Sequence, residues 1–170
     1  EALPTVETLA FCEEEKLLKL WEGLGYYSRA RNLQKAAQRV MEEHGGELPR
    51  DYDALLKLPG IGEYTAGAIA SISYGIPVPA VDGNVMRVFA RLYNDRADIL
   101  MSETKKRYTA RVREELPGDT PGDFNQALME LGATVCGPNR KPDCEHCPCA
   151  AFCLAHIRGT AERLPVKQPK

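Results

Sequence analysis

Apolar residues recur at intervals of three and four along most of this chain, which is the spacing of one helix face. Between residues 13 and 22, acidic residues precede the apolar group Leu17, Leu18, Leu20 and Trp21. Early carboxylates suit the positive end of a helix dipole, so this segment is predicted to be a helix. A second helix is predicted after the turn GLGYYSR, ending at Gly45-Gly46, from the stripe Ala30, Leu33, Ala36, Ala37, Val40 and Met41.

The same spacing predicts further helices at 51–56, 63–74, 85–92, 102–115 and 121–133. Residues that favour a helix start stand at several of these positions, namely Asp51 or Asp53, Ser102 and Pro121. Hairpin signals, sustained alternation and internal repeats are absent. The predicted fold class is therefore all-α.

The length of 170 residues suits one domain, or one domain with an added lobe, at roughly 100–200 residues per domain. No apolar run approaches the roughly 18 residues of a membrane span, and no signal peptide opens the chain. We therefore expect no membrane partner and a cytoplasmic location at a bacterial nucleoid. Because the first residue is Glu1 rather than Met, we also expect a fragment of a longer protein.

The net charge of −2 disfavours binding of polyanions by bulk charge, so local charge matters more. Between residues 16 and 39 only Glu22 is acidic, and the basic residues are Lys16, Lys19, Arg29, Arg31, Lys35 and Arg39. This segment is either a nucleic-acid contact or a solvated helix face, and the sequence leaves both open.

The stretch from Leu58 to Arg87 holds the most specific pattern. In LPGIG, Gly60 and Gly62 flank one apolar residue between two predicted helices. Glycine accepts a positive φ and permits a sharp turn, and it also lets a phosphate approach backbone N–H groups at a helix start. Alone, LPGIG is equally a plain turn. Its specificity comes from VDGNVMR downstream, in which Asp82 supplies one carboxylate shortly before Asn84.

Four of the six cysteines follow the pattern C-x7-C-x2-C-x5-C, namely Cys136, Cys144, Cys147 and Cys153. A disulfide scaffold fits poorly, because a chain with a helical core needs no such cross-links. Four thiolates this close suit a tetrahedral zinc or an iron–sulfur cluster. Only one pair has the CxxC spacing that zinc usually takes, which favours the cluster and leaves zinc open.

Other residues of the cysteine loop have open roles. Cys149 lies between ligand candidates and is a candidate for an alternative ligand, although the spacing Cys-Pro-Cys is too tight for Cys147 and Cys149 to bind together. Arg140, Lys141 and His146 surround the loop and would either face a phosphate backbone or keep the loop soluble.

LPGIGEYTA, VDGNVMRV and the cysteine loop, in this order, resemble the helix-hairpin-helix DNA glycosylases of the endonuclease III superfamily. WEGLGYYSRARNLQKAA and FNQALMELGATVC resemble its MutY-like adenine glycosylases, so the resemblance covers nearly the whole chain. It implies a helical barrel domain at 1–115, part of a six-helix barrel with its hairpin at 58–64, and a lobe at 116–170 with a C-terminal helix and the cysteine loop. It also implies a 4Fe–4S cluster on the four cysteines, and a hairpin that grips the DNA backbone through Pro59, Gly60, Ile61 and Gly62.

Position 64 separates two chemistries in this superfamily. Endonuclease III-like enzymes carry a Lys there, which forms a Schiff base and cuts the strand, whereas this chain has Tyr64. Without an amine nucleophile, elimination through an imine is not available. The resemblance therefore implies a monofunctional glycosylase, and the plain alternative is that Tyr64 only packs.

The resemblance also assigns roles in the reaction. Adenine departs only when protonated and leaves a sugar that approaches an oxocarbenium ion, so a general acid and a carboxylate are both needed. Asp82 matches the carboxylate, and helix capping is its compatible plain role. Tyr64 and Asn84 are expected to orient it. Because the base must be flipped out, Leu24 and Tyr26 are expected to wedge into the stack.

Gln126 matches a position near the adenine pocket. The expected function is excision of adenine mispaired with 8-oxoguanine or guanine in double-stranded DNA, by a monomer. Two other classes stay open: a noncatalytic helix-hairpin-helix DNA-binding module with a structural cluster, and a glycosylase for another mismatched base such as thymine.

The chain departs from the family pattern in three ways. The first cysteine gap is seven residues where six is commonest, and we expect the longer loop to be tolerated. The family's general-acid Glu lies in an upstream helix, and neither Glu1 nor Glu7 stands in that pattern. The family's 8-oxoguanine-reading domain is absent up to Lys170. If the chain is complete as given, we expect weak DNA binding and little or no glycosylase activity.

Overall fold

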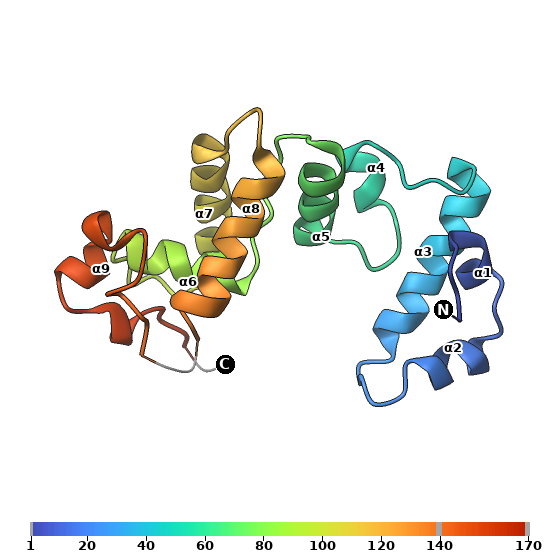
Figure 1. Ribbon diagram of the computed structural model, residues 1–170, viewed down its shortest axis with the longest axis horizontal. Helices are drawn as coiled ribbons and strands as arrows, with labels where there is room; N and C mark the ends of the chain where they lie inside the picture. Colours follow the sequence, from blue (N-terminus) through green and yellow to red (C-terminus); the bar gives the residue numbers. More distant parts are fainter. Residues whose placement is uncertain (1, 139–140, 169–170) are drawn as a thin grey trace. The chain divides into compact units, whose positions relative to one another are not determined.

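The computed structural model describes residues 2–138 and 141–168 (Figure 1). Within these residues the chain is helical, and the only pairing of extended backbone is an isolated bridge between Asp98 and Val166. This confirms the predicted all-α class. No helix in the described ranges is long and apolar enough to cross a membrane.

The chain divides into two compact units, Glu1–Ala66 and Gly67–Lys170, and each is described by itself. The division expected from the sequence, between residues 115 and 116, is a different one and stays a prediction.

The first unit is built around one long helix. Its elements are α1 (Val6–Ala10), α2 (Glu14–Leu20), α3 (Ser28–His44), α4 (Tyr52–Leu56) and most of α5 (Glu63–Ala68). Figure 1 shows α1 lying along α3. Ala30, Ala37 and Val40 form the buried side of α3, and their small side chains allow this close approach.

The sequence pattern predicted no helix before residue 13, so α1 (Val6–Ala10) is a helix that the prediction missed. Gln34 of α3 is buried and its Nε2 donates to the carbonyl of Cys12 at 2.7 Å, while Gln38 Nε2 donates to that of Ala10 at 3.0 Å. These amides satisfy carbonyls at the end of α1, where no further helical turn can do so. Leu33, expected on the apolar stripe, is instead 48% exposed.

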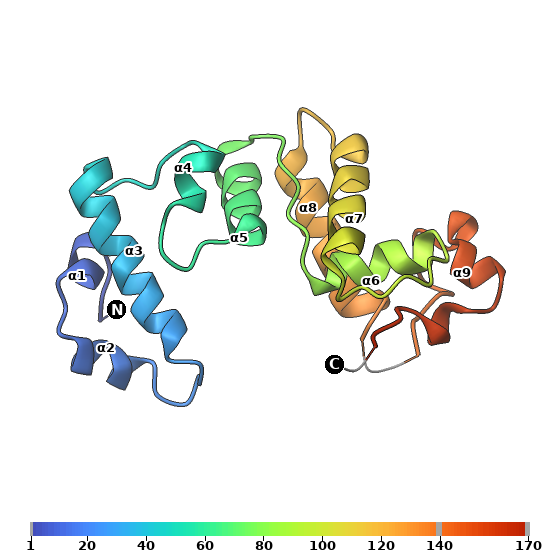
Figure 2. The same cartoon turned by 180° about the vertical axis from the view of Figure 1, so that it is seen from behind.

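The second unit is organised around α6 (Gly83–Leu92), in which every residue from Val85 to Arg91 is buried. Its other elements are η1 (Ile69–Ser73), α7 (Ser102–Glu115), α8 (Pro121–Glu130), η2 (Leu131–Val135), η3 (Ala150–Phe152), α9 (Leu154–Ile157) and η4 (Ala161–Arg163). Figures 1 and 2 show α6 crossing α7 and α8 near one end of that pair, with α9 beside it. Phe89, Tyr108 and Val112 contribute to the core between these helices.

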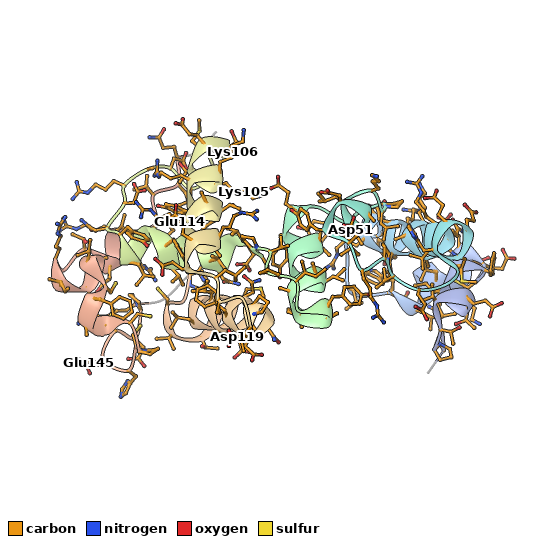
Figure 3. The ribbon with its side chains drawn as sticks, turned by 90° about the horizontal axis from the view of Figure 1, so that it is seen from above. Asp51, Lys105, Lys106, Glu114, Asp119 and Glu145 are labelled. Carbon is orange, nitrogen blue, oxygen red and sulfur yellow. The ribbon has the colours of Figure 1, made fainter. Side chains whose placement is uncertain are left out.

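Charged residues cover the outside of both units. Among the side chains labelled in Figure 3, Lys106 of α7 and Glu145 of the cysteine loop are exposed, and Asp51 stands at the start of α4. Asp51 is the cap that the sequence left undecided between it and Asp53. Ser102 is not the cap of α7 but its first residue, because the cap position is occupied by Met101.

Two predicted helices change their winding before they end. The segment 63–74 is α-helical only to Ala68 and continues as the π-helical η1, and 121–133 is α-helical only to Glu130 and continues as η2. Short π-helical turns are frequently found at functional sites. Backbones come unusually close here: a Cβ on Gly122 would lie 2.7 Å from the carbonyl oxygen of Ser71 in η1.

Candidate active site and cysteine loop

The predicted hairpin is present between α4 and α5 in the first unit. Gly60 has a φ of 77°, and an added Cβ would lie 2.7 Å from the Cβ of Asn32 on α3. Gly62 has neither a positive φ nor a neighbour within 4 Å of such a Cβ. The turn therefore requires glycine at position 60 and not at position 62, which leaves Gly62 free for a backbone ligand. Pro59 and Ile61 are half-buried beside them.

The turn between α2 and α3 presents the two expected wedge residues. Leu24 is 60% exposed and Tyr26 is 82% exposed. Gly23 and Gly25 have positive φ values, and so does Tyr26, with a φ of 47°. A non-glycine residue in this region is uncommon and is found at functional sites.

Tyr64 lies in the first turn of α5 in the first unit and is 39% exposed. Its side chain is therefore accessible, as an orienting role would require. That role stays a prediction.

Asp82 and Asn84 are brought together at the start of α6. Asp82 is the helix cap: its Oδ1 accepts from the backbone N–H of Val85 at 2.9 Å. Its Oδ2 accepts from Asn84 Nδ2 at 2.8 Å. Both carboxylate oxygens are held, while the residue keeps partial access to solvent. Asn84 and Asp82, which the sequence analysis grouped together, are thus hydrogen-bonded, and the orienting role of Asn84 stays a prediction.

Asn125 of α8 holds the loop that leads to Asp82. It is fully buried; its Oδ1 accepts from Ala80 N at 3.1 Å, and its Nδ2 donates to Val78 O at 2.9 Å and Ser71 Oγ at 2.8 Å. The sequence analysis singled out the neighbouring Gln126, which is exposed. The two side chains differ in burial. Asn125 is out of reach of water, so its three hydrogen bonds are made to protein groups instead.

Gly132 in η2 lies directly against the start of α6. An added Cβ would lie 2.6 Å from Asn84 Cβ and 2.9 Å from its carbonyl oxygen. A Cβ added to Gly83, the residue after Asp82, would have no neighbour within 4 Å.

Gly132→Ala is therefore expected to lower the free energy of unfolding by about 1–3 kcal/mol, because the new methyl group overpacks against the backbone of α6. Gly83→Ala adds the same group in open space within a helix and is expected to stabilise by up to about 1 kcal/mol. Urea denaturation of both variants beside the unaltered protein measures this. Equal stability of the two variants would contradict the close approach.

Two buried arginines connect α6 to the cysteine loop. Arg87 Nη2 donates to Asn84 Oδ1 at 2.7 Å and to Gly132 O at 2.6 Å, and its Nε donates to Cys136 O at 2.7 Å. Arg91 is 4% exposed; its Nη1 donates to Cys136 O at 2.9 Å and lies 3.1 Å from Cys136 Sγ. Hydrogen bonds thus connect Asp82 through Asn84 and Arg87 to Cys136, the first of the four ligand candidates.

Burial lowers the pKa of Arg87, and the neighbouring Arg91 lowers it further, whereas the Cys136 thiol and Asp82 oppose the shift. A guanidinium keeps its proton even so. Within the described residues neither arginine forms an ion pair with a carboxylate, and buried charges are normally compensated. The sequence carried a signal of this pair, since two arginines four residues apart interrupt an otherwise apolar stripe.

The four ligand candidates gather at one end of the second unit. Burial raises the pKa of the Cys144 thiol, and the nearby thiols of Cys153, Cys136 and Cys147 raise it further. Burial and the adjacent Cys147 raise the pKa of Cys149 to about 11. No group of three or more His, Cys, Asp or Glu side chains in the described ranges is already arranged to hold a metal ion.

The basic residues of this loop have acidic partners. Lys141 Nζ lies 3.7 Å from Glu162, and His146 Nδ1 lies 2.9 Å from Asp143 Oδ1. Arg140 lies outside the described residues. These pairs are consistent with the interpretation that Lys141 and His146 keep the loop soluble. Exposed ion pairs of this kind contribute little to stability.

Two helices joined at a required glycine, and a helix capped by aspartate ahead of a cysteine loop, agree with the class of helix-hairpin-helix DNA glycosylases that the sequence resembles. Comparison with known proteins agrees: residues 1–117 match the HhH-GPD superfamily base excision DNA repair protein. The chain belongs to this superfamily.

Among relatives, the adenine DNA glycosylase of Rattus norvegicus is 48% identical over 95% of this chain. That of Buchnera aphidicola from Acyrthosiphon pisum is 36% identical over 98%. The chain spans 31% of the rat protein and 47% of the Buchnera protein.

Solved structures agree on the fold. A thermostable thymine-DNA glycosylase superposes with a TM-score of 0.80 at 29% identity, covering 92% of this chain and 72% of that one. Endonuclease III in a non-covalent DNA complex superposes with a TM-score of 0.77 at 28% identity, covering 93% and 72%.

Proposed function

We propose that this protein is a monofunctional glycosylase that hydrolyses the N-glycosidic bond of adenine mispaired with 8-oxoguanine or guanine in double-stranded DNA. The observation that carries the proposal is the identity of 48% to an adenine DNA glycosylase over 95% of the chain. Tyr64 supports it, because a tyrosine in place of the lysine leaves no amine for strand cleavage. We also propose that the protein acts as a monomer in the cytoplasm.

The proposed roles follow the geometry of each unit. Asp82 stabilises the positive charge that develops on the sugar, and its two bonds fix it in place before the reaction begins. Asn84 orients that carboxylate, and Tyr64 orients the sugar or a water molecule. Gln126, exposed on α8, contacts the flipped adenine.

The first unit is proposed to supply the grip on DNA. The backbone N–H groups of the hairpin, from Pro59 to Gly62, bind phosphate, since Gly62 leaves the approach open. Leu24 and Tyr26 insert into the base stack, for which their exposure of 60% and 82% suits them.

Cys136, Cys144, Cys147 and Cys153 are proposed to hold a 4Fe–4S cluster, which would supply a structural cross-link between η2 and α9. Four neighbouring thiols are the donor set that such a cluster takes. Arg91 fits it too, because its buried charge lies at Cys136 Sγ with no carboxylate partner among the described residues, and a cluster with four thiolates is negative. Iron and sulfide analysis tests this, and zinc without iron would contradict it.

Single-turnover assays on matched duplexes test the function, using the protein as its cell makes it, because this chain spans only part of its relatives. Adenine release is expected from A:8-oxoguanine and A:G duplexes, with strand breaks appearing only after alkali treatment. A:T and T:G duplexes serve as controls. Thymine release from T:G would favour a glycosylase for another base, and binding without release of any base would favour a noncatalytic module.

A further inference from the structure

Arg29 is the exception among the arginines of α3. Arg31 pairs with Glu14 at 2.7 Å, Lys19 with Glu22 at 2.7 Å and Arg39 with Glu43 at 3.3 Å, all in solvent. Arg29 forms no ion pair within the described residues. Its guanidinium faces the turn between the two helices instead.

That guanidinium contacts three parts of the turn. Its Cζ lies 5.5 Å from the centroid of the Trp21 ring and 5.8 Å from that of the Tyr26 ring, within reach of cation–π attraction. Its Nη2 donates to the carbonyl of Leu24 at 3.3 Å. On the other side, Trp21 Nε1 donates to the carbonyl of Gly25 at 3.0 Å.

The turn needs such contacts. Gly23, Gly25 and Tyr26 all have positive φ values. This conformation is sterically unfavourable for Tyr26, because it carries a side chain. The ring of Tyr26 is largely exposed, so core packing does not fix it. Backbone bonds hold its two ends, from Leu24 N to Trp21 O at 3.1 Å and from Arg29 N to Tyr26 O at 2.9 Å. The side-chain contacts of Arg29 and Trp21 add to these and favour this conformation.

We propose that Arg29 is a positioning residue for DNA insertion: it holds the turn at 23–26 in the conformation that presents Leu24 and Tyr26 to the base stack. This rests on the proposed function. Holding the turn before DNA arrives removes an ordering cost from binding. A planar guanidinium can serve two rings and one carbonyl together, whereas an ammonium is a compact point charge.

The rival role for Arg29 is a phosphate contact, and the two roles differ in what a lysine does. A phosphate contact survives Arg29→Lys and disappears in Arg29→Gln, lowering the salt dependence of log K by about 0.9. A positioning role is lost in both variants, and the salt dependence is unchanged.

Trp21 makes the test direct, since it is the only tryptophan of the chain. In the free protein, Arg29→Lys and Arg29→Gln are both expected to shift Trp21 emission to the red, because the planar guanidinium that contacts both rings and the Leu24 carbonyl is lost and the hydrogen bond from Trp21 to Gly25 is loosened. Arg31→Lys and Arg31→Gln, two residues along α3, are expected to leave the emission unchanged. Unchanged emission in the Arg29 variants would overturn the proposal.

The second readout is affinity for an A:8-oxoguanine duplex. Both Arg29 variants are expected to bind about tenfold more weakly, the size of two lost cation–π contacts, with the salt dependence of the unaltered protein. Retained affinity in Arg29→Lys together with a reduced salt dependence in Arg29→Gln would overturn the positioning role. If the unaltered protein binds no duplex, the proposed function fails, and the emission of Trp21 alone decides whether Arg29 holds the turn.

Discussion

Asp82→Asn is expected to lower the single-turnover rate of adenine excision by about a thousandfold. The substitution removes the negative charge that stabilises the developing sugar cation. It keeps an oxygen that can accept from Val85 N–H, and asparagine is as good a helix cap as aspartate. The bond that Asn84 Nδ2 donates to Oδ2 is lost, at a cost of about 1 kcal/mol. Duplex affinity should change little and stability only by this amount, which separates chemistry from folding.

Asp51→Asn is the matched control for this change. Asp51 caps α4 as Asp82 caps α6, with its Oδ1 accepting from Ala54 N at 2.8 Å. It lies in the other unit and has no proposed role in the reaction. Full activity is expected in Asp51→Asn. Excision by Asp82→Asn at the rate of the unaltered protein would show that Asp82 is a helix cap and no more.

Arg91→Met is expected to lower the free energy of unfolding of the second unit by about 3 kcal/mol or more. Arg91 Nε donates to Ala161 O and Leu164 O, both at 2.9 Å, and Nη1 donates to Cys136 O. Methionine fills much of the volume but leaves these buried carbonyls without a donor. The iron bound per protein should fall as well, because the segment on either side of the cysteines loses its anchor. Urea denaturation and iron analysis measure the two effects.

Arg111→Met provides the comparison for Arg91. Arg111 is exposed on α7, with its Cζ 4.8 Å from the centroid of the Tyr93 ring. Loss of one exposed cation–π contact costs about 1 kcal/mol or less. Equal losses of stability in the two variants, or full iron content in Arg91→Met, would contradict the anchoring role.

Local features of the site could be predicted from the sequence because their causes are local. The cap at Asp82 needs only the N–H three residues on, and the turn at Gly60 needs only a residue that accepts a positive φ. The cysteine loop was visible from spacing, and the exposed wedge of Leu24 and Tyr26 from its flanking glycines. The prediction that the strand is not cleaved needs only the identity of Tyr64, because a tyrosine has no amine.

The residues that hold the site in place could not be predicted, because their partners are distant in the chain. Nothing in the local pattern of Asn125 marks it as buried, and the apolar stripe around Arg87 gives no indication of which carbonyls it would meet. Asn125 bonds to Ala80, 45 positions away, and Arg87 bonds to Cys136, 49 positions away. The anchoring role of Asn125 was therefore not predicted, whereas the assignment of the neighbouring Gln126 to the adenine pocket stays a prediction.

The sequence by itself determined the helical class and the superfamily resemblance, and it selected Asp82 and the four cysteines as candidates, since residue identity and short spacing suffice for these. Only the tertiary structure decided how they are fixed. The π-helical turns, the contact at Gly132 and the buried guanidinium of Arg91 arise when helices pack closely enough to exclude water. Under that condition each buried polar group needs a specific partner, and the fold alone chooses which.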